Sequence, residues 1–274
     1  ILIRGIPEGE DDLARAERVK SQLTQELSPE FGVEAVKRHL EEAPARYLLT
    51  TSLHRVASHM RLIQHVKRGE ETASQWAEFP LAGYSEFTLC AYGRHGRFAH
   101  VVGTLTANGI NILSAQIFTL ASGMVIRHFR VDNGGGEAIE DATVWDRVVA
   151  DLQDVLAGGV AVRELIKSRR KAVLVQPIHK GALPPTKVEF DNVVSEAYTV
   201  LDVRTRDRLG LLYLISSTLS ELGVDMRSAK IMTEAEQVVD VFYVTNKDGT
   251  KLIDEGRREQ IGLALERALS EGFN

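Results

Sequence analysis

The sequence contains a single cysteine, Cys90, among 274 residues. One thiol cannot form an intrachain disulfide and cannot supply a cysteine-rich zinc site. The sequence also lacks any apolar run near the roughly 20 residues that a membrane-spanning helix needs, and residues 1–5 do not have the pattern of a signal peptide. These absences favour a cytoplasmic protein without a membrane partner. Because Ile1 stands where an initiator Met is expected, we also expect the chain to be a fragment of something longer.

An excess of positive charge is absent as well. The 33 Lys and Arg residues are outnumbered by 38 Asp and Glu residues, for a net charge of -5. A protein that binds nucleic acid through its phosphates normally presents a basic face. Nucleic acid is therefore not an expected partner, whereas a hydrophobic content of 44% suffices for two small cores.

Residue patterns typical of metal or phosphate sites are not found. His54, His59 and His65 share one predicted helix, but spacings of five and six do not bring them to one face, so exposed or packed histidines are the better interpretation. Residues 11–12, both Asp, suit the N-terminus of a helix. Residues 134–136, all Gly, lack the spacing of a phosphate loop and indicate a surface turn. We predict no metal site and no catalytic residue in this chain.

The first part of the chain has helical patterning. Apolar residues recur at helical spacing over residues 11–27, and Pro29 is expected to end that helix. A second helix is expected from a cap at Thr51 or Ser52 to Gly69. Residues 1–78 are therefore predicted to be a helical segment or connector.

The remainder of the chain contains an internal repeat. A strand near 87–91, a helix at 98–105, strands at 110–120 and 124–131 and a helix at 142–156 follow one another, and the same order returns later. Aligning Gly96 with Gly210 gives an offset of 210 − 96 = 114. The same offset pairs Gly109 with Gly223, Asn111 with Asp225, Ser114 with Ser228 and Ile117 with Ile231 and, after one gap, Phe129 meets Phe242. Two copies of one module explain this register.

A strand-helix-strand-strand-helix-strand unit is the ferredoxin-like arrangement, so the predicted fold class is α+β, with two βαββαβ modules preceded by a helical segment. Module 1 is placed at 79–166, with its last strand at 159–166, and module 2 at 199–274, with its last strand short or missing. Residues 167–198, which contain three prolines, are expected to be a linker with one extra strand at 187–190. A separate third domain there would be too short.

The segment Arg-Asp-Arg-Leu-Gly-Leu-Leu at 206–212, followed by Leu-Gly-Val-Asp-Met at 222–226, resembles the signature of ACT regulatory domains. Residues 38–51, 115–119 and 188–192 resemble segments around the ACT pair of the bifunctional uridylyltransferase and uridylyl-removing enzymes of nitrogen control. With these segments the resemblance covers nearly the whole chain.

The resemblance implies a function. That family modifies the PII signalling protein according to glutamine level, with a nucleotidyltransferase domain, an HD hydrolase domain and a glutamine-sensing ACT pair. The chain would be the C-terminal sensory part, without a cofactor of its own, of a magnesium-dependent parent that acts on PII. Neither an Asp-x-Asp nor a His-Asp motif occurs in it, so both active sites would lie elsewhere.

The candidate ligand site is the loop that enters the first helix of each repeat. Glycine there lets backbone N–H groups at a helix N-terminus approach a carboxylate, and Asp225 or Asn111 would accept hydrogen bonds from an ammonium or amide group. The predicted ligand-binding residues are Asp207, Gly210, Leu211, Leu212, Asp225, Ser228, Gly96, Asn111 and Ser114.

Several alternatives stay open. Gly210 and Gly223 would serve equally well as plain turn residues, and the loop of module 1 departs from the pattern, with Arg97 where module 2 has Leu211. The ACT pair could be a structural or dimerisation scaffold, or the amino-acid sensor of another enzyme. The sequence does not decide whether the modules pair within one chain or across a homo-oligomer.

Overall fold

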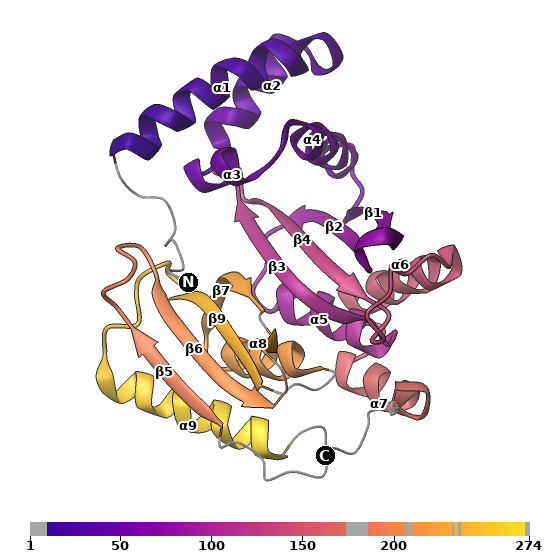
Figure 1. Ribbon diagram of the computed structural model, residues 1–274, viewed down its shortest axis with the longest axis vertical. Helices are drawn as coiled ribbons and strands as arrows, with labels where there is room; N and C mark the ends of the chain where they lie inside the picture. Colours follow the sequence, from indigo (N-terminus) through magenta and orange to yellow (C-terminus); the bar gives the residue numbers. More distant parts are fainter. Residues whose placement is uncertain (1–9, 174–185, 207–209, 232, 235–236, 272–274) are drawn as a thin grey trace.

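The computed structural model describes residues 10–173, 186–206, 210–231, 233–234 and 237–271. Two side-by-side modules share one antiparallel sheet, with helices on both faces of the first module and on one face of the second (Figure 1). The helices and antiparallel strands confirm the predicted α+β class. The sheet runs in the order β1-β2-β4-β3-β7-β9-β6-β5, with the short β8 beside β9.

The N-terminal segment is helical, as predicted. It consists of α1 (Glu10–Phe31), α2 (Val33–Glu42), α3 (Ala45–Thr50) and α4 (Leu53–Lys67). The prediction that Pro29 ends the first helix was wrong, since a proline in the last turn leaves α1 intact up to Phe31. The helices α2 and α3 were not predicted. Buried side chains such as Tyr47 and Leu40 pack with Phe118 and Ile126 against one face of module 1.

Module 1 begins earlier than expected. It comprises β1 (Ala73–Phe79), the short 3-10 helix η1 (Pro80–Ala82), β2 (Tyr84–Tyr92), α5 (Arg97–Ala107), β3 (Asn111–Thr119), β4 (Met124–Asp132) and α6 (Ala142–Leu156). The fourth strand of its sheet is β1, which pairs antiparallel with β2 and precedes it in the chain. The strand predicted at 159–166 is wrong. That segment enters α7 (Val162–Val173), whose Val162, Leu165 and Ile166 are buried at helical spacing.

Module 2 repeats this permuted order. It contains β5 (Lys187–Asp191), β6 (Thr199–Arg206), α8 (Leu211–Glu221), β7 (Val224–Lys230), β8 (Thr233–Glu234), β9 (Gln237–Asn246) and α9 (Glu255–Glu271). The strand expected within a linker is β5, and it pairs with β6 as the edge strand of this module. Each module therefore takes its outer strand from the segment before it, which explains why no strand follows α9 among the described residues.

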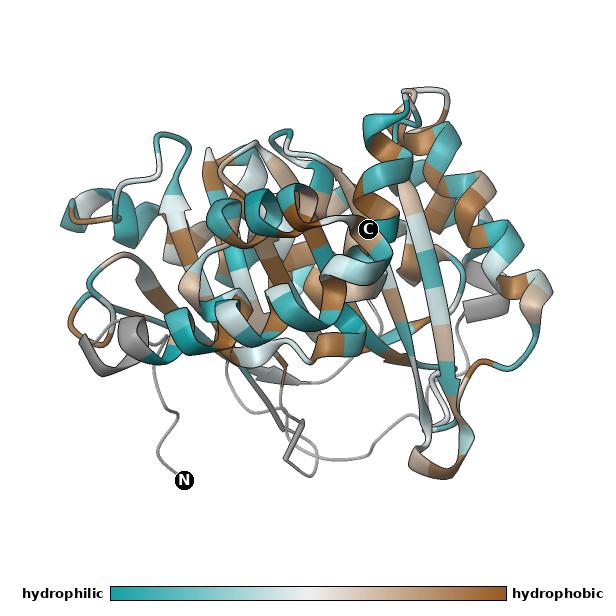
Figure 2. Cartoon of the chain, turned by 90° about the horizontal axis from the view of Figure 1, so that it is seen from above, coloured by the Kyte–Doolittle hydropathy of each residue, from teal (hydrophilic) through white to brown (hydrophobic). Residues whose placement is uncertain are grey.

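The two modules pair within one chain. Strands β3 and β7 run antiparallel, with Ala115 opposite Ala229 and Gln116 opposite Ser228. The helices on the other face from α4 share a single apolar core that includes Phe129 of module 1 and Phe242 of module 2. Hydrophobic and hydrophilic residues alternate around these helices (Figure 2). The open question of pairing is thus answered for this chain.

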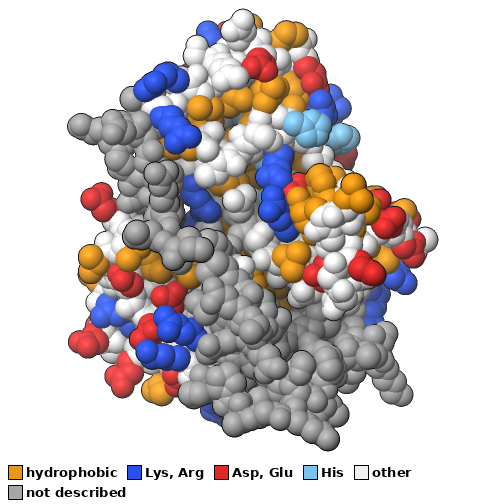
Figure 3. Space-filling model, in the orientation of Figure 1, with side chains coloured by type: hydrophobic (Ala, Val, Ile, Leu, Met, Phe, Trp, Pro, Cys, Tyr) orange, Lys and Arg blue, Asp and Glu red, His pale blue; other side chains and the backbone are white. Residues whose placement is uncertain are grey.

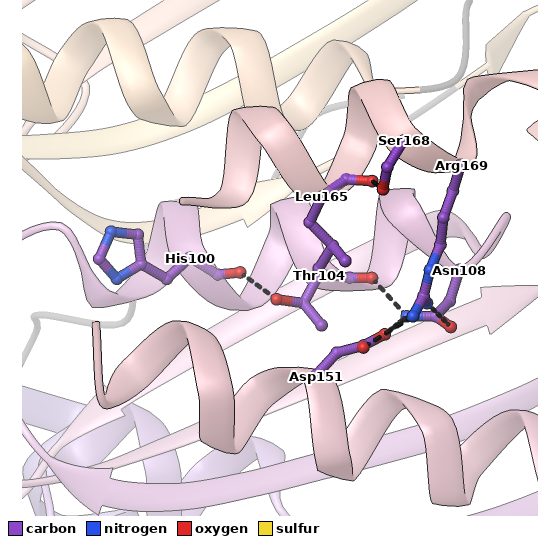
Figure 4. Close-up of polar contacts among 7 residues, drawn as sticks. All are labelled: His100, Thr104, Asn108, Asp151, Leu165, Ser168 and Arg169. Atoms are coloured by element: carbon purple, nitrogen blue, oxygen red, sulfur yellow. Dashed lines mark hydrogen bonds and ion pairs between the residues drawn. The ribbon is translucent and has the colours of Figure 1, made fainter. Parts of the chain in front are cut away.

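Helix α7 is anchored to α5 and α6 by a polar network (Figure 4). Arg169 reaches both carboxylate oxygens of Asp151, one of them at 2.8 Å from Nη2, and its Nη1 donates to Asn108 Oδ1 at 2.7 Å. Asn108 in turn donates to Asp151. The network ties the end of module 1 to its first helix and holds α7 where a strand was expected.

The described surface carries charge of both signs. On the face shown in Figure 3, Lys and Arg side chains are interspersed with Asp and Glu rather than gathered into one field. Among the described residues, no helix combines the length and the apolar character that crossing a membrane requires.

Candidate functional site

A cavity of about 440 Å³ lies at the junction of the two modules. Module 1 contributes the loop from Gly93 to Gly96 and the first turn of α5, and module 2 contributes the start of β7 and Lys247. Sites for small molecules commonly occupy about 300–1,000 Å³ and favour domain boundaries. The volume and position therefore suit a small metabolite.

The loop of module 1 is shaped by Gly96. This residue has a φ of 77° and stands at the N-cap of α5, a conformation that side chains with a Cβ adopt reluctantly. A Cβ there would lie 3.2 Å from Ser220 Oγ of α8, so glycine also lets the two modules approach each other. The first N–H groups of a helix lack intrahelical acceptors, and in α5 they belong to Phe98 and Ala99, which line the cavity. This wall suits an anion.

The opposite wall carries Asp225, at the start of β7. Its Oδ1 accepts a hydrogen bond from His95 Nδ1 at 2.8 Å, across the module boundary. The two side chains are 30% and 32% exposed, so they lie at the mouth of the cavity. Arg227 Nη2 lies 3.7 Å from the second oxygen of Asp225. Asp225 is the only carboxylate among the described residues that line the cavity.

Arg127, on β4, places a charged side chain in the buried interior of this site. Its side chain is 3% exposed, and Nε and Nη1 are buried without a hydrogen-bond partner in the part of the chain that the structure describes. Burial, reinforced by the nearby Arg97, lowers the pKa of Arg127 to about 10, which still leaves the guanidinium charged at neutral pH. An unpaired buried cation is costly by several kcal/mol in order of magnitude. A bound anion would relieve that cost.

Arg97 shows how a neighbouring cation is satisfied. It is also almost fully buried, but its Nη2 donates to Glu71 Oε1 at 2.7 Å. Arg94 lies 4.0 Å from the same carboxylate. The contrast shows that Arg127 is the buried arginine of this region whose donors remain available.

The structure brings together only some of the predicted residues. Gly96 and Asp225 line the same cavity, although each had been grouped with the other residues of its own module. The cavity thus combines the loop of one module with the carboxylate of the other, whereas the prediction from sequence paired each loop with the strand that follows it in the same module. Because β3 pairs with β7, the loop of one module faces the strand of the other.

The other predicted residues lie away from this cavity. Ser228 is 2% exposed and accepts a hydrogen bond from Arg46 Nη2 of α3 at 2.8 Å, on the sheet face that α3 packs against. Gly210 begins α8 with a φ of 82°. Leu211 and Leu212 are buried in the shared core, Asn111 donates to Asp132 at 3.4 Å, Ser114 pairs opposite Arg130, and Asp207 lies outside the described residues.

Sequence reasoning missed Arg127 and His95. The alternation of β4 held a usable signal, since Val125, Arg127 and Phe129 fall on one face of the strand and Phe129 is in the core. A charged residue at a core position is a candidate for function. No group of three or more His, Cys, Asp or Glu residues arranged for a metal ion occurs among the described residues.

Comparison with known proteins identifies relatives of this chain. Residues 187–273 match the family described as ACR9-like, ACT-like domain. The bifunctional uridylyltransferase/uridylyl-removing enzyme of Azospirillum brasilense is 32% identical over 94% of the chain and 27% of its own length. That of Rhodospirillum rubrum is 30% identical over 86% of the chain and 25% of its own length.

The solved structure of aspartate kinase from Synechocystis is a weaker match. It is 18% identical, covers 69% of this chain and 27% of its own, and has a TM-score of 0.37, which is too low to carry an argument. The sequence relatives are the informative ones, and this chain spans only about a quarter of their length. Within that extent, the chain belongs to the family of the bifunctional uridylyltransferase/uridylyl-removing enzymes.

Proposed function

We propose that the module junction binds a free amino acid and that this ligand is glutamine. The observation that supports the proposal is the pairing, in one cavity, of the unpartnered Arg127 guanidinium with the Asp225 carboxylate. An α-amino acid carries a carboxylate and an ammonium group. Arg127 and the N-terminus of α5 would take the carboxylate, and Asp225 would take the ammonium.

The choice of glutamine rests on the resemblance to the PII-modifying enzymes. The residues that line the cavity suit the α-carboxylate and α-ammonium groups of an amino acid, but they select less clearly among its side chains. Arg227 and Lys247 stand beside Asp225 and would disfavour a cationic side chain. This argument separates glutamine from lysine or arginine.

The chain would act as the regulatory part of a longer, magnesium-dependent cytoplasmic enzyme that modifies PII. A ligand biases a two-state equilibrium only through a difference in its affinity for the two states. The junction suits this role because both modules line the cavity, so any change in their pairing alters the site. On this proposal the chain itself performs no chemistry.

A structural scaffold is the second candidate. The short β3–β7 pairing and the shared core would suffice to hold neighbouring domains together without a ligand. An unpaired buried arginine is then unexplained, because a scaffold gains nothing from its cost.

The proposal is tested by thermal unfolding of this chain with a panel of amino acids. A ligand that binds only the folded state stabilises it, by ~2.7 kcal/mol at a hundredfold excess over Kd. We expect glutamine to raise the Tm and Asp225→Asn to reduce that rise, because the amide loses the charge that holds the ammonium. If no amino acid shifts the Tm at millimolar concentration, the scaffold is the better account.

A further inference from the structure

A second cavity, of about 400 Å³, lies on the face of module 1 that α1 to α4 cover. It is lined by residues of α4, β1 and β2 and by His128 of β4. Arg127, which precedes His128 in the same strand, lines the junction cavity instead. Because successive side chains of a strand point to opposite faces of a sheet, the two cavities lie on opposite faces of β4. They have no described lining residue in common.

Buried polar side chains line this second cavity where the packed layer around it is apolar. His128 is 5% exposed, and Thr88 of β2 and Ser58 of α4 are also buried. His128 Nδ1 and Thr88 Oγ1 share a hydrogen bond of 2.9 Å. Nε2 of the same imidazole is buried without a hydrogen-bond partner in the described part of the chain. A buried polar atom without a partner is costly, and a bound molecule with a suitable polar group would supply one.

Glu86 of β2 adds a carboxylate to the same wall. Arg55 and Arg130 both contact its Oε1, the latter from Nε at 3.4 Å. His128 Nε2 lies 3.7 Å from that oxygen, beyond hydrogen-bond distance. The described residues make no contact of this kind with Oε2, so a bound molecule can donate a hydrogen bond to it. Since two guanidinium groups already balance one carboxylate, that donor needs no positive charge.

The part of the cavity that β1 lines is apolar and open to solvent. Ala77 and Phe79 lie there, and both are exposed. The ring of Phe79 is stacked on that of Tyr84, with centroids 5.0 Å apart, so it offers a flat surface. A ligand with an apolar, flat body and one polar group directed inward would match both parts of the cavity.

We propose that this cavity between α4 and the sheet of module 1 is a second ligand site, which binds a small uncharged molecule through a carboxamide or similar group at Glu86 and His128. The amide nitrogen donates to Glu86 Oε2. An amide offers both a donor and an acceptor, so it can also pair with His128 Nε2 in either tautomer. A free amino acid is less suited, because no unpartnered buried cation like Arg127 lines this cavity among the described residues.

The test is NMR titration of the chain with three ring compounds that differ in one group: uncharged benzamide, anionic benzoate and cationic benzamidine. We expect benzamide to bind with a Kd of about 1 mM, ordinary for so small a ligand, and the other two at least about tenfold more weakly. Benzoate lacks a donor for Glu86, and benzamidine lacks an acceptor and adds a third cation. Binding of either charged compound as tight as that of benzamide would overturn the uncharged class. Absence of benzamide binding at about 10 mM would overturn the site.

Two variants test whether benzamide occupies this cavity. Ala77→Leu fills space from an exposed position of β1, and His128→Leu removes the unpartnered nitrogen, so each is expected to weaken benzamide binding at least about tenfold. Glu78, the next residue of β1, does not line the cavity, and Glu78→Leu is expected to bind like the wild type. Ala77→Leu decides the question if His128→Leu does not fold. Unweakened binding by Ala77→Leu, or an equal loss in Glu78→Leu, would overturn the proposal, whether or not glutamine binds at the module junction.

Discussion

The two modules place opposite charges at the same position of their sheets. With Phe129 aligned to Phe242, Arg127 of β4 corresponds to Asp240 of β9, and both side chains are almost fully buried, at 3% and 1% exposed. A carboxylate ligand suits the first position and is repelled by the second. The two modules therefore share a fold but differ in charge at this buried position, and we expect one amino-acid site in each chain.

The modules also differ in what covers them. Helices α1 to α4 pack on the outer face of module 1, and no described helix does the same for module 2 (Figure 1). Arg46 of α3 is the described hydrogen-bonded link from this layer to module 2, through Ser228. Ser228 and Asp225 belong to the same strand, so the helical layer contacts the strand that also lines the candidate site.

The largest expected effect concerns the helical layer of module 1 in acid. The hydroxyl of Tyr47 lies between His39 Nε2 and His59 Nδ1, 3.1 Å from each. Burial lowers the pKa of His39 to about 4 and that of His59 to about 3. Both stay neutral in the folded state while the unfolded chain takes up protons below about pH 6.5, so stability is present above that pH and is lost as the pH falls.

The expected loss between pH 6.5 and pH 5 is ~3 kcal/mol for the two histidines together, because each loses ~1.4 kcal/mol per pH unit well below pH 6.5 and half of that at pH 6.5, where the unfolded form is half protonated. Titration of Glu86 does not contribute in this pH range. Although burial opposes it, contacts with His128, Arg55 and Arg130 hold the pKa of Glu86 at about 2, so its contribution disappears only at lower pH. Urea unfolding measured from pH 7 to pH 5 tests the claim. A stability that is flat over this range would contradict it.

A smaller effect is expected where the modules meet through their helices. A methyl group at Gly103 of α5 would lie 2.6 Å from Tyr213 Cδ2 of α8 and would also collide with Val162 of α7. We expect Gly103→Ala to destabilise the chain by about 1–3 kcal/mol through overpacking. The equivalent residue of module 2 is Ser217, which is partly exposed. Ser217→Ala serves as the control and is expected to change stability by less than about 0.5 kcal/mol.

The smallest expected effect is on the link between the helical layer and module 2. Arg46 donates to Ser228 and lies over the ring of Phe118, 5.5 Å from its centroid. Arg46→Met is expected to cost ~1–2 kcal/mol of unfolding free energy. Arg61, which lies over Phe31 but is exposed, provides the matched control, and Arg61→Met is expected to cost a few tenths of a kcal/mol. Equal losses of unfolding free energy for the two variants would show that Arg46 stabilises the chain no more than an exposed arginine does.

Much of the fold could be predicted from sequence because glycine turns and apolar spacing recur at a fixed offset. The helices α5 and α6, the strands β3 and β4, and the counterparts α8 and β7 were placed by this register. The outer strands were not, because a βαββαβ template puts the last strand after the second helix. The chain instead supplies β1 and β5 beforehand. The strand β5 was expected from its own alternation but was placed in a linker, because the order of connection leaves no trace in local periodicity.

The candidate site was predictable only in part for a related reason. Gly96 and Asp225 were both chosen as residues suited to a zwitterion, but their meeting depends on which strands of the two modules pair. Which strands of the two modules pair is decided by tertiary contacts, and the residue pattern of one sequence does not specify them. Arg127 carried a local signal, its position on the apolar face of β4, and its missing partner became visible only when the surrounding side chains were in place.

The most direct test of one site per chain at the module junction is isothermal titration of glutamine into the wild-type chain, Arg127→Met and Asp240→Asn. The account predicts one glutamine per wild-type chain, roughly hundredfold weaker binding by Arg127→Met, since a buried charge-assisted contact is lost, and an affinity within about twofold for Asp240→Asn. It also predicts that ligand-free Arg127→Met is more stable than the wild type, because an unpaired buried cation has been removed. Two glutamines per chain, or undiminished binding by Arg127→Met, would contradict it.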